Sequence, residues 1–126
     1  MNTKNKFEKK ERLSSHSLIL KVVEKGKSFK VFPFYVKWTY VEKNTAPVQI
    51  AFSVSKKKYK RAVDRNLIKR RCKEAYRLQK NPLIEKINAQ NKNIIIIISY
   101  INKEILEYKK IEKAIQKIIY SLTEEK

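Results

Sequence analysis

The chain has 126 residues, about the length of one domain, and its 42% apolar residues suffice for one modest core. Its 31 Lys and Arg against 12 Asp and Glu leave a formal net charge of +19. This charge indicates a polyanionic partner, with nucleic acid first and an acidic membrane surface second. The longest apolar run, residues 94–98, is far shorter than the roughly 20 residues of a membrane span, and the N-terminus lacks the apolar segment of a signal peptide. We therefore expect a cytoplasmic protein without a membrane partner.

The sequence contains no set of residues typical of a catalytic or metal site. Cys72 is the only cysteine and His16 the only histidine, so neither an internal disulfide nor a Cys/His metal site is expected. Asp64 and Glu74 are ten positions apart, which is about 15 Å along a helix and too far for one metal or an acid–base pair. A single glycine excludes a glycine-rich phosphate loop. We expect no catalytic side chain and no metal bound by the protein.

The first half of the chain reads as an arm, a helix and two strands. Residues 1–10 are polar and basic and are predicted to form a flexible arm. Residues 12–25 are predicted to be helical, and Gly26 stands where a left-handed C-cap residue would end that helix. Apolar residues alternate with polar ones over 34–40, and again over 48–55 after a turn at 44–47. This period of two predicts two strands.

The second half contains the most basic segment of the chain. Residues 63–78 are predicted to form a basic helix, followed by a turn and a short helical or irregular stretch to residue 88. The β-branched run at 93–98 is typical of a strand that is buried on both faces. Residues 104–122 carry the apolar stripe of a last helix, and 124–126 form a tail. The order predicts one α+β domain over residues 11–123, with helices on one face of a sheet.

The basic helix concentrates its charge on one side. Residues 56–80 hold 12 Lys or Arg and two acids. Four cations recur at intervals of four residues and so share one row of a helix: Arg65, Lys69, Lys73 and Arg77. An apolar stripe would turn this row toward solvent: Ile68, Cys72, Ala75 and Tyr76. Like charges at this spacing repel, so the row makes sense if a polyanion lies along it. Asn66 and Arg70 stand on the adjacent row, and the Asn66 amide suits a nucleotide edge or a phosphate.

The two predicted strands present polar side chains on one of their faces. Phe34, Trp38 and Tyr40 are expected in the core. The opposite faces carry Tyr35, Lys37, Ser53 and Ser55. These residues either face solvent or line a trough for single-stranded nucleic acid.

One segment resembles a known family. Ser53-Val54-Ser55-Lys56-Lys57, followed by Ala62-Val63-Asp64-Arg65-Asn66 and by Lys69-Arg70 and Glu74-Ala75, is similar in register to the bacterial ribonuclease P protein subunit. That family shows Ser-Val-Ser-Lys-Lys, then Ala-Val-x-Arg-Asn-Arg-x-Lys-Arg and Arg-Glu-Ala. Leu67 stands at the motif's second arginine, and neighbouring Arg71 is a candidate substitute.

The resemblance implies a fold and a role. The fold is an α+β sandwich with the order αβββαβα and a left-handed βαβ crossover that carries the basic helix. The role is that of a monomeric RNA-binding subunit that joins a catalytic RNA and assists it in removing the 5′ leader of precursor tRNA. Magnesium ions, held mainly by the RNA, would perform the hydrolysis.

The resemblance also implies two sets of contact residues. The RNA subunit would contact Lys56, Lys57, Arg61, Arg65, Asn66, Lys69, Arg70, Lys73 and Arg77. The leader would lie in a cleft between the first helix and the sheet, against Phe34, Tyr35, Lys37, Ser53 and Ser55. Two alternatives remain open, an architectural rRNA-binding protein and a protein-only nuclease. The missing carboxylate pair argues against the nuclease, and the Arg-Asn helix motif favours the ribonuclease P subunit over the rRNA-binding protein.

Overall fold

The computed structural model describes residues 7–43 and 46–124, so part of the predicted arm, turn and tail lies outside the described residues. After a short 3-10 helix at Lys9–Glu11, the elements are α1 (His16–Lys25), β1 (Lys27–Val31), β2 (Phe34–Glu42), β3 (Val48–Val54), α2 (Ala62–Gln79), α3 (Asn81–Asn88), β4 (Lys92–Tyr100) and α4 (Tyr108–Glu124). No helix in these ranges has the length and apolarity needed to cross a membrane.

The strands form one mixed sheet of order β1-β2-β4-β3. β2 runs antiparallel to β1 and β4, whereas β3 and β4 are parallel and are connected through α2 and α3. The predicted α+β domain with the order αβββαβα is therefore confirmed, with α3 as an additional short helix. The hand of the β3–β4 crossover stays a prediction.

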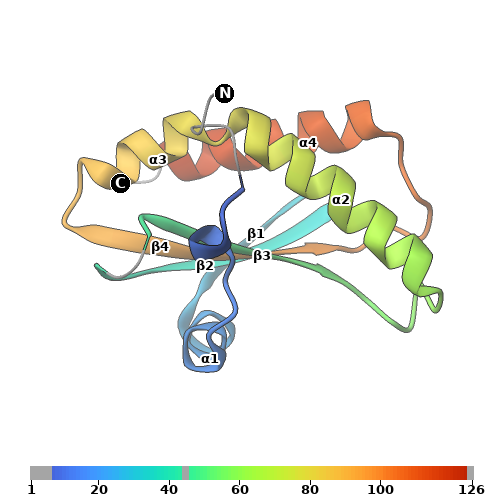
Figure 1. Cartoon of the computed structure of the whole chain (residues 1–126), viewed down its shortest axis with the longest axis horizontal. Helices are drawn as coiled ribbons and strands as arrows, with labels where there is room; N and C mark the ends of the chain where they lie inside the picture. Colours follow the sequence, from blue (N-terminus) through green and yellow to red (C-terminus); the bar gives the residue numbers. More distant parts are fainter. Residues whose placement is uncertain (1–6, 44–45, 125–126) are drawn as a thin grey trace.

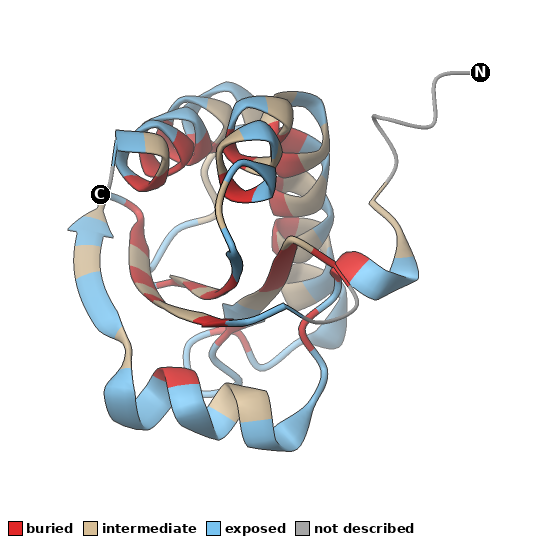
Figure 2. Cartoon of the chain, turned by 90° about the vertical axis from the view of Figure 1, so that its left-hand side faces the viewer, coloured by how far each residue is buried: buried red, intermediate tan, exposed pale blue. Residues whose placement is uncertain are grey.

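Helices cover both faces of the sheet. In Figure 1, α2, α3 and α4 lie above the sheet and α1 lies below it. Figure 2 shows the same layers from the side, with buried residues concentrated between the upper helices and the sheet. The prediction that the helices share one face is wrong for α1, because α1 buries Val22 against the other face of the sheet.

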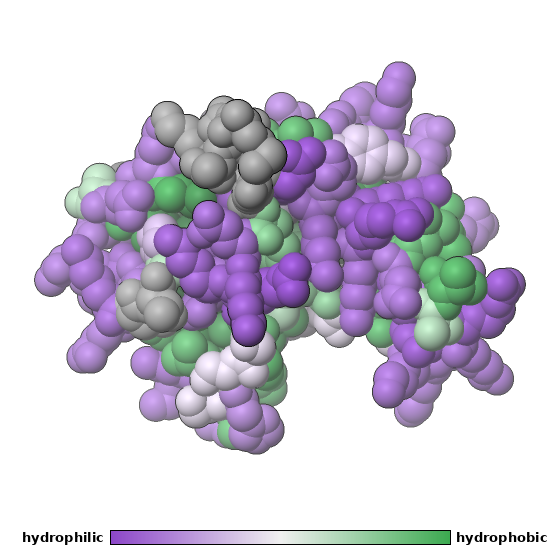
Figure 3. Space-filling model, in the orientation of Figure 1, coloured by the Kyte–Doolittle hydropathy of each residue, from purple (hydrophilic) through white to green (hydrophobic). Residues whose placement is uncertain are grey.

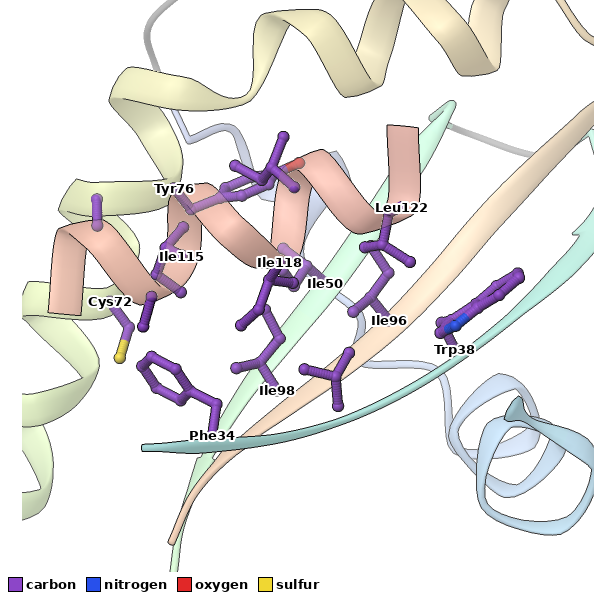
Figure 4. Packing of buried hydrophobic residues seen from close by; sticks show 14 of the residues in the cluster. Phe34, Trp38, Ile50, Cys72, Tyr76, Ile96, Ile98, Ile115, Ile118 and Leu122 are labelled. Carbon is purple, nitrogen blue, oxygen red and sulfur yellow. The ribbon is translucent and has the colours of Figure 1, made fainter. Parts of the chain in front are cut away.

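The main core lies between the sheet and the upper helices (Figure 4). The sheet contributes Phe34, Trp38, Ile50, Ile96 and Ile98, and the helices contribute Cys72, Tyr76, Ile115, Ile118 and Leu122. A smaller cluster between α1 and the sheet contains Leu13, Val22, Val41 and Ile95. Because β4 buries alternate isoleucines in each cluster, the prediction of a strand buried on both faces is confirmed. Each buried isoleucine or leucine contributes about 1.5–3 kcal/mol, so the two clusters account for much of the stability.

The start of the first helix differs from the prediction. α1 begins at His16, and the Ser15 side chain caps it by accepting a hydrogen bond from the Leu18 N–H at 3.5 Å. Arg12, where the helix was predicted to begin, is extended instead and bridges Ile50 of β3, and the Leu13 N–H donates to the Ile50 carbonyl at 3.0 Å. Local periodicity does not reveal this pairing, since its partner lies far along the chain.

The glycine after α1 has a different role from the predicted one. Gly26 has φ −71° and ψ 150°, so it is not in the left-handed conformation. Its N–H donates to the Val22 carbonyl at 2.8 Å. A Cβ at this position would collide with that carbonyl and would lie 3.1 Å from the Trp38 carbonyl. Glycine is needed here because the end of α1 approaches β2 closely.

Candidate nucleic-acid interface

α2 presents the predicted basic face. The residues of the apolar stripe, Ile68, Cys72, Ala75 and Tyr76, are buried against the sheet and α4, as predicted. This leaves Asn66 and Arg70 exposed on the outer side, with Lys69, Lys73 and Arg77 half-buried beside them. Figure 3 shows hydrophilic side chains over most of this side of the molecule.

A groove of about 570 Å³ runs along this face. It is lined by Phe7, Arg12, Asn66, Lys69, Arg70, Lys73, Glu74 and Arg77. Five of these side chains are cationic and one is acidic. The acid, Glu74, accepts two hydrogen bonds from Arg77, at 3.0 Å and 2.7 Å, which lowers the pKa of Glu74 and raises the pKa of Arg77. Among the residues that the structure describes, the remaining cations of the groove therefore have no carboxylate partner.

The electrostatics of the groove favour an anion. Partial burial lowers the pKa of Lys73, and the neighbouring positive charges of Arg12 and Lys69 lower it further. Three cations thus crowd one another in a site that is partly shielded from water. A phosphate between them would relieve this repulsion and form charge-assisted hydrogen bonds.

One wall of the groove comes from the N-terminal strap, which we define as residues 7–13. Phe7 packs edge-on against Tyr76 of α2, with ring centroids 5.9 Å apart, and the Arg12 guanidinium lies 5.7 Å from the centroid of the Phe7 ring. Residues 7–10 were predicted to be part of a flexible arm, but they pack onto the domain. The sequence reasoning missed Arg12 as a candidate contact residue, because only the folded strap brings it beside α2.

The strap is anchored by a buried ion pair. Lys80, at the end of α2, is 2% exposed, and its ammonium donates to both carboxylate oxygens of Glu11 at 2.8 and 2.9 Å. The Gln49 amide adds a hydrogen bond to the Lys10 carbonyl at 3.1 Å. These contacts fix the two residues before Arg12, and the hydrogen bond from the Leu13 N–H to the Ile50 carbonyl fixes the residue after it.

Side chains at both ends of the loop between β3 and α2 form hydrogen bonds with the loop backbone. Arg65 donates to the Tyr59 and Lys60 carbonyls at 2.7 and 2.9 Å. The Ser55 hydroxyl accepts from the N–H groups of Lys57 and Lys58 at 3.1 and 3.4 Å. Arg65 and Ser55 therefore shape this loop. The exposed basic side chains of the loop are Lys56, Lys57, Lys58, Lys60 and Arg61, and of these Lys58 donates to the Ile101 carbonyl at 2.8 Å.

Asn66 and Arg70 lie at the centre of the basic face. A second groove, of about 560 Å³, is lined by Arg61, Val63, Asp64, Asn66, Leu67 and Arg70, so Asn66 and Arg70 border both grooves. Arg71 does not replace the arginine that is missing at Leu67. Its guanidinium donates to the Leu106 carbonyl, in the segment between β4 and α4, at 2.7 Å.

The opposite side of the sheet carries three of the residues predicted for a leader trough, Tyr35, Lys37 and Ser53, whereas Ser55 lies past the end of β3 in the loop that it shapes. Tyr35 and Ser53 both pair in register with Ser99 of β4, so these three residues lie in one row across the sheet, on the α1 side. Lys37 donates to the Val23 carbonyl at 2.7 Å and thereby ties α1 to β2. In Figure 1 the right-hand part of this underside has no helix over it. Ser99 is an additional candidate that the sequence reasoning did not assign to the trough.

Phe34 requires a correction. It points into the main core between the sheet and the upper helices, and it has no exposed surface (Figure 4). Phe34 therefore has no surface to offer a leader, and it lies on the face of the sheet opposite Tyr35. It anchors β2 in the core between the sheet and the upper helices.

The comparison with known families is decisive. The family model described as ribonuclease P matches residues 7–123. This chain belongs to the ribonuclease P protein family. The chain is 34% identical to the ribonuclease P protein component of Porphyromonas gingivalis over 110 residues, which are 86% of this chain and 80% of that protein. It is 33% identical to the component from Dictyoglomus turgidum over 112 residues, covering 89% and 88% of the two chains.

Solved ribonuclease P proteins share the fold. The protein from Thermotoga maritima superposes with a TM-score of 0.68 at 20% identity and covers 88% of this chain and 96% of its own. The protein from Staphylococcus aureus gives 0.65 at 23% identity and covers 90% and 95%. As a ribonuclease P protein, this chain is a component of the ribonuclease P enzyme, whose role is tRNA processing. The family assignment therefore decides against the rRNA-binding alternative.

The structure shows the surroundings of the side chains that the sequence analysis weighed as catalytic or metal-binding candidates. Among the described residues, no group of three or more His, Cys, Asp or Glu side chains could hold a metal ion. Burial raises the pKa of the Cys72 thiol to about 12, so this thiol is a poor nucleophile at neutral pH. Asp64 lies 4.0 Å from Arg61 and Glu74 is bound by Arg77, so each carboxylate faces a cation of its own helix region.

Proposed function

We propose that the basic face of α2, together with the N-terminal strap, docks the catalytic RNA of ribonuclease P. The observation that carries the proposal is the groove of about 570 Å³ along α2, which we call the α2 groove. In it, five cations and the Asn66 amide surround one acid, Glu74, which is already paired with Arg77. Phosphate oxygens match these donors, because guanidinium and ammonium groups bind them through charge-assisted hydrogen bonds. The residues proposed to contact the RNA are Arg12, Lys56, Lys57, Arg61, Asn66, Lys69, Arg70 and Lys73. Arg65 and Arg77 contribute indirectly, because they bind the preceding loop and Glu74.

The underside of the sheet is proposed to hold the 5′ leader of precursor tRNA. Tyr35 offers an aromatic surface in the same row as the hydroxyls of Ser53 and Ser99, and Lys37 lies two residues further along β2 on the same face. Aromatic and basic groups on a sheet suit single-stranded RNA, since bases stack on rings while phosphates meet cations. This trough and the α2 groove lie on opposite faces of the sheet, so the two RNA segments would not compete.

The chemistry in this proposal belongs to the RNA. Magnesium ions held mainly by the RNA subunit would activate the water that cleaves the phosphodiester bond. The protein contributes binding and orientation, as a monomer in the cytoplasm.

The docking face is tested by single substitutions at its centre. Asn66→Ala and Arg70→Ala remove side chains that border both grooves and that make no hydrogen bond within the described residues. Each lost charge-assisted hydrogen bond should weaken binding to a bacterial ribonuclease P RNA by about 1.5–3 kcal/mol. For Arg70→Ala the dependence of log K on log salt should also become shallower by about one unit.

The matched control is Lys92→Ala, which removes one exposed positive charge at the start of β4, away from α2. All variants should keep the thermal stability of the parent protein. If Arg70→Ala binds the RNA as tightly as Lys92→Ala across the salt series, α2 is not the docking face.

A further inference from the structure

A second basic site lies away from α2, where the β1–β2 hairpin meets α4. Phe32, at the tip of this hairpin, is 69% exposed. Beside it is a cavity of about 170 Å³. The cavity is lined by Phe32, Pro33, Leu106, Lys110, Lys113, Ala114 and Lys117. Its floor is apolar, one wall is aromatic and its rim carries three cations.

The three lysines lie on one flank of α4. Lys110, Lys113 and Lys117 are spaced by three and four residues and so share a helix face. The other flank contacts α2, where the Gln79 amide donates to the Glu112 carbonyl at 3.1 Å. The site is therefore separate from the α2 groove. Within residues 7–43 and 46–124, none of the three ammonium groups has a carboxylate within 4.0 Å, although Glu112 and Glu124 lie on the same helix and Glu107 directly precedes it.

We propose that this cavity binds one unpaired nucleotide of RNA. The base would stack on Phe32 above the apolar floor formed by Pro33, Leu106 and Ala114. The flanking phosphates would meet the lysines. A single exposed phenylalanine is common on protein surfaces and needs no explanation by itself. The inference depends on the combination, because an aromatic platform beside unpaired cations is how proteins hold single-stranded nucleic acid without reading its sequence.

The edge position of β1 makes the site accessible. In Figure 2, the strand that follows α1 curves upward along the side of the sheet and ends beside the helix layer. Residues of the hairpin tip and of α4 can therefore reach one RNA strand together. An acidic protein segment is the competing occupant, since it would satisfy the lysines without using the ring.

A tryptophan reporter tests stacking directly. Phe32→Trp introduces an exposed indole, whereas the natural Trp38 is 3% exposed. The background is the double variant Asn66→Ala/Arg70→Ala, so that the α2 groove contributes little and failure of one site is distinguishable from failure of the other. Addition of a short oligouridylate should quench the new indole. Addition of polyglutamate should not, and equal quenching by both would overturn the proposal.

Affinity measurements in the same background supply the second readout. Phe32→Ala and Lys113→Ala should each weaken oligouridylate binding on the order of tenfold. Lys109→Ala, which removes one exposed charge from α4 but does not line the cavity, should have a clearly smaller effect. Equal losses in Lys113→Ala and Lys109→Ala, or no loss in Phe32→Ala, would show a general charge effect and overturn the site.

Two further fluorescence titrations of the Phe32→Trp variant, in otherwise natural protein, determine whether the nucleotide comes from the RNA subunit or from the substrate. Quenching by ribonuclease P RNA alone assigns the nucleotide to the RNA subunit. Quenching that begins only when precursor tRNA joins the complex assigns it to the substrate. Absence of quenching in both arms would overturn the proposal for the assembled enzyme.

Discussion

At the scale of single residues, the cations of α2 divide into two groups. Arg65 binds the carbonyls of the preceding loop, Arg71 binds the Leu106 carbonyl and Arg77 binds Glu74. These three arginines mainly shape the protein. Arg70 and Lys73, with Arg12 from the strap, have no such carbonyl or carboxylate contact among the described residues and are the groups that an RNA phosphate would meet. The charge density of the sequence does not distinguish the cations that shape the protein from those that are free to meet RNA.

Tyr35 gives the clearest test of the leader trough. Its ring is half-buried beside Ser99, whereas Lys37 also holds α1, so substitution of Lys37 would disturb the helix as well. Tyr35→Ala in the reconstituted enzyme should weaken binding of precursor tRNA by roughly 1–3 kcal/mol for each base that stacks there. Binding of mature tRNA should not change, because mature tRNA has no leader.

The comparison variant for this prediction is Tyr120→Ala, which removes a tyrosine that is 66% exposed on α4. The ratio of the two dissociation constants, for precursor and mature tRNA, is the measured quantity. The trough assignment is wrong if Tyr35→Ala and Tyr120→Ala give the same ratio.

At the scale of elements, the strap matters because it closes an edge of the sheet. Leu13 pairs with β3, Phe7 packs on α2, and Glu11 reaches the end of α2. The strap thus joins the helix layer to the edge strand. It also places Arg12 in the α2 groove, so its position affects both stability and RNA binding.

Glu11→Ala should destabilise the protein strongly. The substitution leaves the Lys80 ammonium buried without its carboxylate, which typically costs about 3–5 kcal/mol. Glu8→Ala is the matched control, because the Glu8–Lys10 pair is at the surface, with a distance of 3.5 Å, and such pairs contribute about 0–1 kcal/mol. Urea unfolding of both variants measures the difference. Similar free energies of unfolding for Glu8→Ala and Glu11→Ala would show that the buried pair does not anchor the strap.

At the scale of the whole molecule, the sequence predicts most of the elements but not how the ends of the chain pack. Period and composition identify the basic helix, the β3 and β4 strands and the last helix, because these signals are local. The strap and the start of α1 were missed, since Leu13 pairs with Ile50, which is far along the chain. β1 has no clear alternation and was expected only from the family resemblance.

The same limit applies to the candidate sites. Alternation correctly separates Tyr35 and Lys37 from Phe34 and Trp38, but it cannot say which set faces the larger helix layer. Alternation placed Phe34 in the core, where it lies, whereas the leader contact expected of it came from the family resemblance and is not accessible. The sequence found the α2 face because the helix carries its own period, while Arg12 enters the groove only through tertiary contacts.

The two proposed RNA surfaces are linked by the strap. In Figure 1 the strap descends from the helix layer, in front of β3, toward α1 below the sheet. RNA that follows the basic side chains would pass from the α2 groove across this edge to the trough. The whole molecule would then act as a basic support between a catalytic RNA and its substrate, without a catalytic group of its own.

Cleavage of precursor tRNA at low magnesium tests this account most directly. The protein alone should not cleave. A bacterial ribonuclease P RNA should cleave faster when the protein is added, and the double variant Asn66→Ala/Arg70→Ala should give less stimulation at the same concentration. The account would be contradicted if the protein failed to stimulate the RNA. It would equally be contradicted if RNA-free protein cleaved the substrate and Asp64→Ala or Glu74→Ala abolished that cleavage.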